Sequence, residues 1–359
     1  MKAVGVLENL PTENEASFVD FELAAPVAEG KDLLVRIDGI SLNPVDFKER
    51  RDIIGKLVEP LILGWDACGE VLAVGEGVKT YKVGDMVMYA GEINRPGCYA
   101  ELQLVDERIV GPKPESLTPE EAACVPLTTL AAWEALFDRL EIDRITNENT
   151  ALLIIGGAGG LGSMAIQFAR QFSKCKIIAT ASRKESKDWC LKMGAHHVID
   201  HSKNLKHQLV NLGHDTVPLI LNLSNNIPYW EVMADIVSPE GAICLVASTK
   251  AKLDLDLFMG KSVRINYELM FTRSLYSTDK MSMQADVLRR VAQMIDSGKI
   301  VHTRTEDMGK ISAVNIRKAH ACVETGRMIG KATLSGIATL HSRYRPAQNA
   351  HRRGRLEHP

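Results

Sequence analysis

The sequence predicts an α/β protein in which a mostly β domain precedes a doubly wound parallel sheet. Three observations support this prediction. An apolar run ends in a glycine-rich turn at residues 151–162, strands alternate with helices from there to residue 247, and short strands separated by turns fill residues 1–110. Alternating strands and helices are typical of parallel sheets that carry helices on both faces.

The glycine-rich turn follows residues 151–155, a continuous apolar run typical of a strand buried on both faces. The turn contains G-x-G-x-x-G at Gly157, Gly159 and Gly162. An amphipathic segment follows, with apolar residues at spacings of four, three and four: Leu161, Ala165, Phe168 and Phe172. Strand, glycine turn and helix in this order are the context in which the motif binds a dinucleotide.

Glycines let the turn approach a diphosphate closely, and the N–H groups and dipole at the start of the helix favour its charge. The alternative is a tight strand-to-helix turn without a ligand, but the elements that follow favour the dinucleotide site. The residues expected at the cofactor are Gly156, Gly157, Ala158, Gly159, Gly160, Leu161 and Gly162.

The segment after the turn predicts strands at 176–182, 197–200, 217–223 and 241–247. Helices are expected between them, at 184–193, around 205–212 and at 229–237, and Gly194 and Gly213 end two of these helices. In such a sheet the dinucleotide lies at the carboxyl ends of the strands.

The end of the second strand indicates which nicotinamide cofactor fits. An NAD site places a carboxylate there, bonded to the ribose 2′-hydroxyl. This chain has Thr180-Ala181-Ser182-Arg183-Lys184 instead. A hydroxyl and two cations suit a 2′-phosphate, although Arg183 and Lys184 could also belong to a solvated loop. We predict NADP(H), bound through Ser182 and Arg183.

The composition is that of an ordinary globular protein, with 45% apolar and 25% charged residues and a formal net charge of −2. This balance does not suggest nucleic acid or an anionic membrane as a partner. Residues 1–10 lack the features of a signal or transit peptide, and no apolar run is long enough to span a bilayer. We expect a cytoplasmic protein of two domains.

The first part of the chain predicts short strands at 1–7, 33–41, 68–74, 86–89 and 99–105. This spacing favours a compact, mostly β domain such as a partly closed barrel. A helix then begins after Thr118, its N-cap, with Pro119 at the first position and Glu121 closing a capping box. A second helix is expected at about 128–139.

Three segments resemble the zinc-free quinone oxidoreductase branch of the medium-chain dehydrogenase/reductase superfamily: residues 40–46 (ISLNPVD), 63–69 (LGWDACG) and 125–129 (VPLTT). The glycine turn and Gly330-Lys331 also fit, and the resemblance covers about residues 1–336. Residues 104–138 most resemble a bacterial subgroup labelled "zinc-type alcohol dehydrogenase-like". The resemblance implies a GroES-like catalytic domain, to which the chain returns near residues 257–276.

The resemblance also bears on zinc. Zinc-dependent relatives have a cysteine at the position of Asn43 and a His-Glu pair at the positions of Trp65 and Asp66. A catalytic zinc needs three nitrogen, sulfur or carboxylate ligands, and no histidine precedes His196. We predict no metal site. The seven cysteines are scattered without a C-x-x-C, which argues against a disulfide framework. The alternative to a chain without a metal site is that three cysteines converge in space to bind zinc: Cys68, Cys98 and Cys124.

The resemblance implies that Asn43 and Asp46 line the cleft for nicotinamide and substrate and that Thr128 contacts the nicotinamide carboxamide. The residues alone predict a plain turn for N-P-x-D and a helix N-cap for Thr128. Trp65 either walls an aromatic substrate or packs in the core. His201 matches a family position near the adenosine phosphate, where many members have tyrosine. The remaining expected cofactor contacts are Asn222, Val246 and Lys331.

We predict that the first part of the GroES-like domain spans residues 1–127 and the Rossmann NADP-binding domain 128–265. The chain then returns to the catalytic domain over 266–336. Residues 337–359 are rich in arginine and histidine and have almost no apolar spacing, which is typical of a disordered or vector-derived tail.

These observations predict an NADPH-dependent reductase that transfers a hydride to a quinone or an α,β-unsaturated carbonyl without a metal. A conjugated acceptor spreads the developing charge, so hydrogen bonds suffice where a Lewis acid is missing. The alternatives are a zinc-dependent alcohol dehydrogenase and a non-enzymatic NADPH-binding protein. The resemblance also implies a homodimer, formed through an edge strand near residues 265–270.

Overall fold

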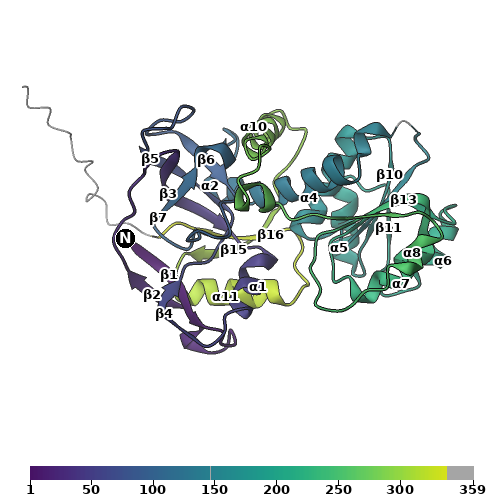
Figure 1. Cartoon of the computed structure of the whole chain (residues 1–359), viewed down its shortest axis with the longest axis horizontal. Helices are drawn as coiled ribbons and strands as arrows, with labels where there is room; N and C mark the ends of the chain where they lie inside the picture. The colour runs from purple at the N-terminus through teal and green to yellow at the C-terminus, as the bar shows by residue number, and fades with distance from the viewer. Residues whose placement is uncertain (146, 338–359) are drawn as a thin grey trace, which may run out of the picture.

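The computed structural model describes residues 1–145 and 147–337 and confirms the predicted α/β class (Figure 1). A six-stranded sheet forms one lobe, here called the parallel-sheet lobe, and sheets of seven and three strands form the N-terminal lobe. In Figure 1 the purple and blue strands lie in the N-terminal lobe, and the yellow end of the chain returns to it. All but the first residue of the predicted tail at 337–359 lie outside the described residues.

The parallel-sheet lobe has the strand order β11-β10-β9-β12-β13-β14, with every pair parallel. In chain order this is the 3-2-1-4-5-6 arrangement of the Rossmann fold. Its strands are β9 Ala151–Ile155, β10 Lys176–Thr180, β11 His197–Ile199, β12 Val217–Asn222, β13 Val237–Leu245 and β14 Arg264–Tyr267. Its helices are α4 Gly160–Phe172, α5 Lys184–Lys192, α6 Leu205–Asn211, α7 Trp230–Ile236 and α8 Asp256–Met259.

The N-terminal lobe contains a sheet of order β15-β16-β3-β5-β6-β8, with β7 also paired to β3, and a second sheet of order β2-β1-β4. Its strands are β1 Lys2–Glu8, β2 Val19–Glu22, β3 Asp32–Ser41, β4 Lys56–Leu61, β5 Ala67–Val74, β6 Met86–Tyr89, β7 Leu102–Asp106, β8 Val110–Pro112, β15 Arg304–Lys310 and β16 Lys331–Ser335. The remaining helices are α1 Pro44–Arg51, α2 Pro119–Ala123, α3 Pro126–Trp133, α9 Thr272–Leu275, α10 Met283–Asp296 and α11 Ala313–Glu324.

The structure corrects two local predictions. N-P-x-D is not a plain turn but the start of α1, because proline fits the first helical position and Asn43 precedes it as N-cap. The helix expected from residue 128 begins at Pro126, so Thr128 lies inside the helix and is not its N-cap. After Trp133 this helix widens into a π-helical turn, η3 Glu134–Arg139. The capping box of Thr118 and Glu121 is confirmed.

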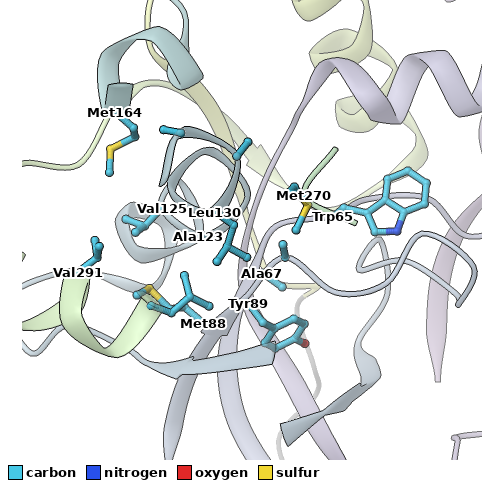
Figure 2. Close-up of a cluster of buried hydrophobic side chains, with 14 of the residues drawn as sticks. Trp65, Ala67, Met88, Tyr89, Ala123, Val125, Leu130, Met164, Met270 and Val291 are labelled. Carbon is cyan, nitrogen blue, oxygen red and sulfur yellow. The ribbon is translucent and has the colours of Figure 1, made fainter. Parts of the chain in front are cut away.

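Strand β9 is a continuous apolar run because both of its faces are buried in the core. Leu152 and Ile154 join the large cluster that extends into the N-terminal lobe, part of which Figure 2 draws. Ala151, Leu153 and Ile155 face a second cluster on the opposite side of the sheet. The boundaries proposed at 127/128 and 265/266 fall inside α3 and β14, and β14 still belongs to the parallel sheet.

Candidate active site

The glycine turn is shaped by close backbone contacts. Gly156 has a φ of +88°, a region that favours glycine. A Cβ on Gly162 would lie 2.5 Å from the carbonyl oxygen of Gly156, so the first turn of α4 packs directly on the preceding loop. Thr180 at the end of β10 holds the turn, because its hydroxyl accepts from the Gly156 N–H at 3.0 Å.

The space in front of α4 fits a diphosphate. Gly159 is the N-cap of α4 and supplies no capping side chain. A Cβ there would meet no atom within 4 Å, so the region ahead of the helix is open. The first N–H groups of a helix lack intrahelical partners and favour an anion at this place. The local geometry therefore suits the cofactor phosphates expected from the sequence.

Apart from Lys331, the predicted cofactor residues outside the turn lie at or just after the carboxyl ends of strands of the parallel sheet. Asn222 ends β12, and its buried amide donates to Asn226 Oδ1 at 2.9 Å, so it orders the loop that follows. Arg183 is the N-cap of α5 and donates a hydrogen bond to the carbonyl of Arg327 in the other lobe. The other three residues also follow strands of this sheet: Ser182, His201 and Val246.

Residues 330 and 331 join the N-terminal lobe to the glycine turn. The Gly330 N–H donates to the carbonyl of Ala158 at 2.9 Å, and Gly330 forms a parallel bridge with Gly159. The stem of Lys331 lies across α4, because a Cβ on Gly160 would come within 2.5 Å of its Cδ. Lys331, predicted as a cofactor contact, therefore stands beside the expected diphosphate position.

Lys331 meets Asn43 and Asp66 in a buried cluster, here called the lysine cluster. Lys331 Nζ donates to Asp66 Oδ2 at 2.7 Å and to Asn43 Oδ1, and Asn43 Nδ2 donates to Asp66 Oδ2 at 2.9 Å. The second oxygen of Asp66 accepts the N–H of Leu127 at 2.8 Å. Burial raises the pKa of Asp66, and the Lys331 charge opposes this rise.

Asp46 lies next to this cluster, and its carboxyl group has other hydrogen-bond partners. Oδ2 of Asp46 accepts the Asn43 N–H and the Tyr99 hydroxyl, both at 2.9 Å. Tyr99 also contacts Nε2 of His320 at 3.1 Å. Burial raises the pKa of Asp46 to about 7, although the Asn43 N–H and the Tyr99 hydroxyl lower it. Asp46 therefore hydrogen-bonds to the lysine cluster through Asn43, and the charges of Lys331 and Asp66 also act on its pKa.

Thr128 is buried beside the glycine turn, and its methyl group faces Gly160. Its hydroxyl donates back to the carbonyls of Cys124 and Val125 at 3.2 and 3.3 Å. Trp65 is also buried; it donates through Nε1 to the Glu92 carbonyl at 3.0 Å and packs edge-on against Phe271. These contacts favour the core alternative for Trp65.

Comparison with known proteins gives matches along most of the chain. Residues 29–115 match the model of the alcohol dehydrogenase GroES-like domain, and residues 160–292 match that of the zinc-binding dehydrogenases. A "zinc-type alcohol dehydrogenase-like protein" of Staphylococcus epidermidis is 35% identical over 93% of this chain and 99% of its own length. The chain belongs to the medium-chain dehydrogenase/reductase superfamily. It is an oxidoreductase that takes a nicotinamide cofactor.

Two further relatives of this superfamily cover nearly the whole chain. The crystal structure of a putative zinc-dependent alcohol dehydrogenase from Rhizobium etli is 43% identical, with a TM-score of 0.90, over 94% of this chain and 99% of that one. A 2-methylene-furan-3-one reductase of Solanum lycopersicum is 26% identical over 92% of this chain and 81% of its own length. No helix among the described residues has the length and apolar character needed to cross a membrane.

Several of these names mention zinc, but the side chains that the structure describes do not form a zinc site. Within residues 1–145 and 147–337, no three or more histidine, cysteine, aspartate or glutamate side chains form a group that could hold a metal ion. Cys98 donates to the Asp66 carbonyl at 3.5 Å, and Cys124 to the Glu120 carbonyl at 3.6 Å. Asn43 and Asp66 stand where zinc ligands were expected from relatives, and both bond to Lys331.

Proposed function

We propose that this oxidoreductase is an NADPH-dependent reductase of quinones or α,β-unsaturated carbonyl compounds that works without a metal. The observation that supports it most directly is the lysine cluster: Asn43 and Asp66, which replace the cysteine and the glutamate expected in zinc-dependent relatives, both bond to Lys331. When bound, NADPH would supply the hydride.

The choice of acceptor follows from the charge that must be stabilised. A simple ketone would leave a localised alkoxide, which needs a Lewis acid or strong hydrogen-bond donors. An enone takes the hydride at its β-carbon, which spreads the negative charge over an enolate. A proton from solvent then converts the enolate into the saturated ketone. The relative named 2-methylene-furan-3-one reductase supports this choice, because a methylene-furanone is a conjugated enone.

The residues divide the work of binding. The glycine turn and the start of α4 hold the diphosphate, with Lys331 beside them, and Ser182 and Arg183 accept the 2′-phosphate. Asn43 and Thr128 would line the nicotinamide; Thr128 lies against Gly160 of the turn, and Asn43 bonds to Lys331 beside it. Asp46 fixes the backbone N–H of Asn43 and so acts through Asn43.

An NADPH-oxidation screen tests the proposal, with quinones, enones, aldehydes and ketones in the presence and absence of a chelator. We expect turnover of an enone or quinone that the chelator leaves unchanged, and elemental analysis without stoichiometric zinc. The zinc-dependent alcohol dehydrogenase would be favoured instead by a different result. In that case only aldehydes or ketones would be turned over, and the chelator would remove about one zinc per chain and abolish the activity.

We also propose a homodimer. The edge strand β14 has one open side, because it pairs with β13 alone among the described strands. Tyr267 at its end and Leu269 just after it are exposed. An open strand edge of this kind pairs readily with a symmetry mate. Light scattering at micromolar concentration should give the mass of two chains, and a monomer there would refute this assembly.

A further inference from the structure

A second buried polar cluster, here called the glutamate cluster, lies where the chain leaves the parallel sheet. Glu268 follows β14 and accepts from Arg139 Nε at 2.9 Å. Glu134 accepts from Gln284 Nε2 at 3.2 Å and lies 3.4 Å from Arg273 Nη1. Arg273 also bonds to Asp138 at 2.7 Å. The cluster therefore ties η3, the end of β14, α9 and α10 together.

The charges in this cluster do not balance. Glu134, Glu268 and Asp138 are three carboxylates, whereas Arg139 and Arg273 are the two cations that bond to them. Glu134 and Glu268 are only 1% and 2% exposed, so water screens their charges little, whereas Asp138 and Arg139 are partly exposed. Gln284 is neutral, and the Cys244 thiol of β13 also faces Glu268.

Two carboxyl oxygens in the cluster have no hydrogen-bond partner, Oε2 of Glu134 and Oε1 of Glu268, and the amide oxygen Oε1 of Gln284 has none either. A carboxylate only accepts hydrogen bonds, so two ionised groups cannot bond to each other, whereas one proton turns an oxygen into a donor. The same proton removes the excess negative charge. One added proton therefore both supplies a hydrogen-bond donor between the carboxyl groups and neutralises the excess charge.

We infer that Glu134 and Glu268 share one proton in the native state, and that its loss at alkaline pH loosens residues 268–273 from Trp65. This inference concerns the fold and holds whether or not the proposed substrate class is right.

The ionisation of the pair agrees with this reading. Burial and the neighbouring Glu134 raise the pKa of Glu268 to about 8, against the charge of Arg139. Burial likewise raises the pKa of Glu134, against the charge of Arg273. Two carboxyl groups that share a site titrate as one unit.

Residues 268–273 carry this proton's effect toward the candidate site. Gln284 donates both to Glu134 and to the carbonyl of Met270, the latter at 2.7 Å. Phe271 packs edge-on against Trp65, with ring centroids 6.2 Å apart. Figure 2 draws Met270 and Trp65 in the same buried cluster. Trp65 in turn precedes Asp66 of the lysine cluster, so the wall beside that cluster depends on the glutamate pair.

The pH dependence of stability tests the shared proton. Between the carboxyl pKa of the unfolded chain and about pH 8, the native state holds a proton that the unfolded state has released. The wild-type folding constant should therefore fall with rising pH, by up to about tenfold per pH unit. In Glu268→Gln the amide N–H takes the place of the proton, so the slope should be shallower by one proton, while the contribution of Asp46, whose pKa is raised to about 7, stays in both proteins. Urea denaturation from pH 5 to 9 measures both proteins.

Glu231→Gln is the matched control, because Glu231 is an exposed carboxylate in the same lobe. Its stability should follow the wild-type slope. If Glu268→Gln also follows that slope, the shared proton is excluded. Infrared difference spectroscopy of wild type gives a second measurement that needs no variant. A protonated carboxylic acid band should disappear with a midpoint near pH 8, above the midpoint near pH 7 expected for Asp46, and the absence of a band that titrates near pH 8 would overturn the inference.

Hydrogen exchange tests the loosening itself. After correction for intrinsic rates, peptides covering 268–276 should lose protection in wild type above pH 8 and keep it in Glu268→Gln. Equal protection of wild type on both sides of the transition would show that the proton does not control this segment.

Discussion

The glycine turn and the lysine cluster lie side by side and depend on opposite properties of their residues. The turn depends on the absence of side chains, since a Cβ on Gly162 would strike backbone and one on Gly159 would enter the open space ahead of α4, where we propose the cofactor phosphates. The lysine cluster depends on charged and polar side chains that bond to one another as a set. The turn is a local product of consecutive residues, whereas the cluster is assembled across the whole chain.

This difference predicts how each region fails. A substitution in the turn changes shape, so its cost should follow the nearest atoms and vary little with pH. A substitution in the cluster leaves a charge without its partner in a place that water does not reach, so its cost should be large and depend on pH.

Lys331→Met should give the largest loss. It leaves Asp66 buried and unpaired, with an expected cost of about 3–5 kcal/mol in unfolding free energy. Without Lys331 the native pKa of Asp66 rises further above that of the unfolded chain, so stability is lost as pH increases and the deficit should be smaller at pH 5 than at pH 8. Urea denaturation at the two pH values measures this difference.

The double variant Lys331→Met/Asp66→Asn is the control for this pair. Because the second substitution removes the stranded charge, the double variant should cost less than the sum of the two single ones. Additive costs, or a Lys331→Met deficit that does not change with pH, would show that the cluster does not act as a set.

Gly162→Ala should cost less, about 1–3 kcal/mol, because its Cβ would overlap the backbone of Gly156 and Gly157. The higher helix propensity of alanine offsets at most about 1 kcal/mol of this cost. Thermal denaturation should show this loss equally at pH 5 and pH 8, in contrast to Lys331→Met. Weakened NADPH binding is expected as well, since the turn must move.

Arg183→Ala should barely change stability, because it removes an exposed hydrogen bond to Arg327, but it should separate the two cofactors. A charge-assisted hydrogen bond contributes about 1.5–3 kcal/mol, or about 10–100-fold in affinity. The KM for NADPH should rise by that factor, less so at high salt, while the KM for NADH stays the same. A wild-type preference for NADH, or equal weakening of both cofactors, would reject the assignment of the 2′-phosphate to Arg183.

The same contrast explains what the sequence could and could not predict. The parallel sheet follows from apolar runs, glycines and helix caps that occur within a few residues of one another. Strands β4 and β15 were missed because they are mostly exposed and lack a regular apolar alternation. Asn43 and Lys331 were expected at the site, but 288 residues separate them, so no local pattern predicts their contact.

Asp66 shows the limit most clearly. The sequence marked it only as a position without a zinc ligand, yet the structure makes it the partner of Lys331, 265 residues away. Tyr99 and His320 likewise give no signal in the sequence, because their role arises only when α1 and α11 pack together around Asp46. Pairs of charges brought together by the return of the chain need the fold itself.

Gly159→Ala gives the smallest expected change in stability and the sharpest test of the turn. Its backbone is extended, with φ −72° and ψ 171°, and a Cβ there would meet no atom within 4 Å. Alanine is a poorer N-cap than glycine, but it also lowers the conformational entropy of the unfolded chain, which stabilises the fold by about 0.4–1 kcal/mol, so the two effects nearly cancel.

The added methyl group nevertheless stands where the diphosphate must approach the helix. Calorimetric titration should therefore show weaker NADPH binding in a protein whose melting temperature matches wild type. Unchanged affinity would mean that the cofactor phosphates do not lie against this turn, and the site would have to be placed elsewhere along the sheet.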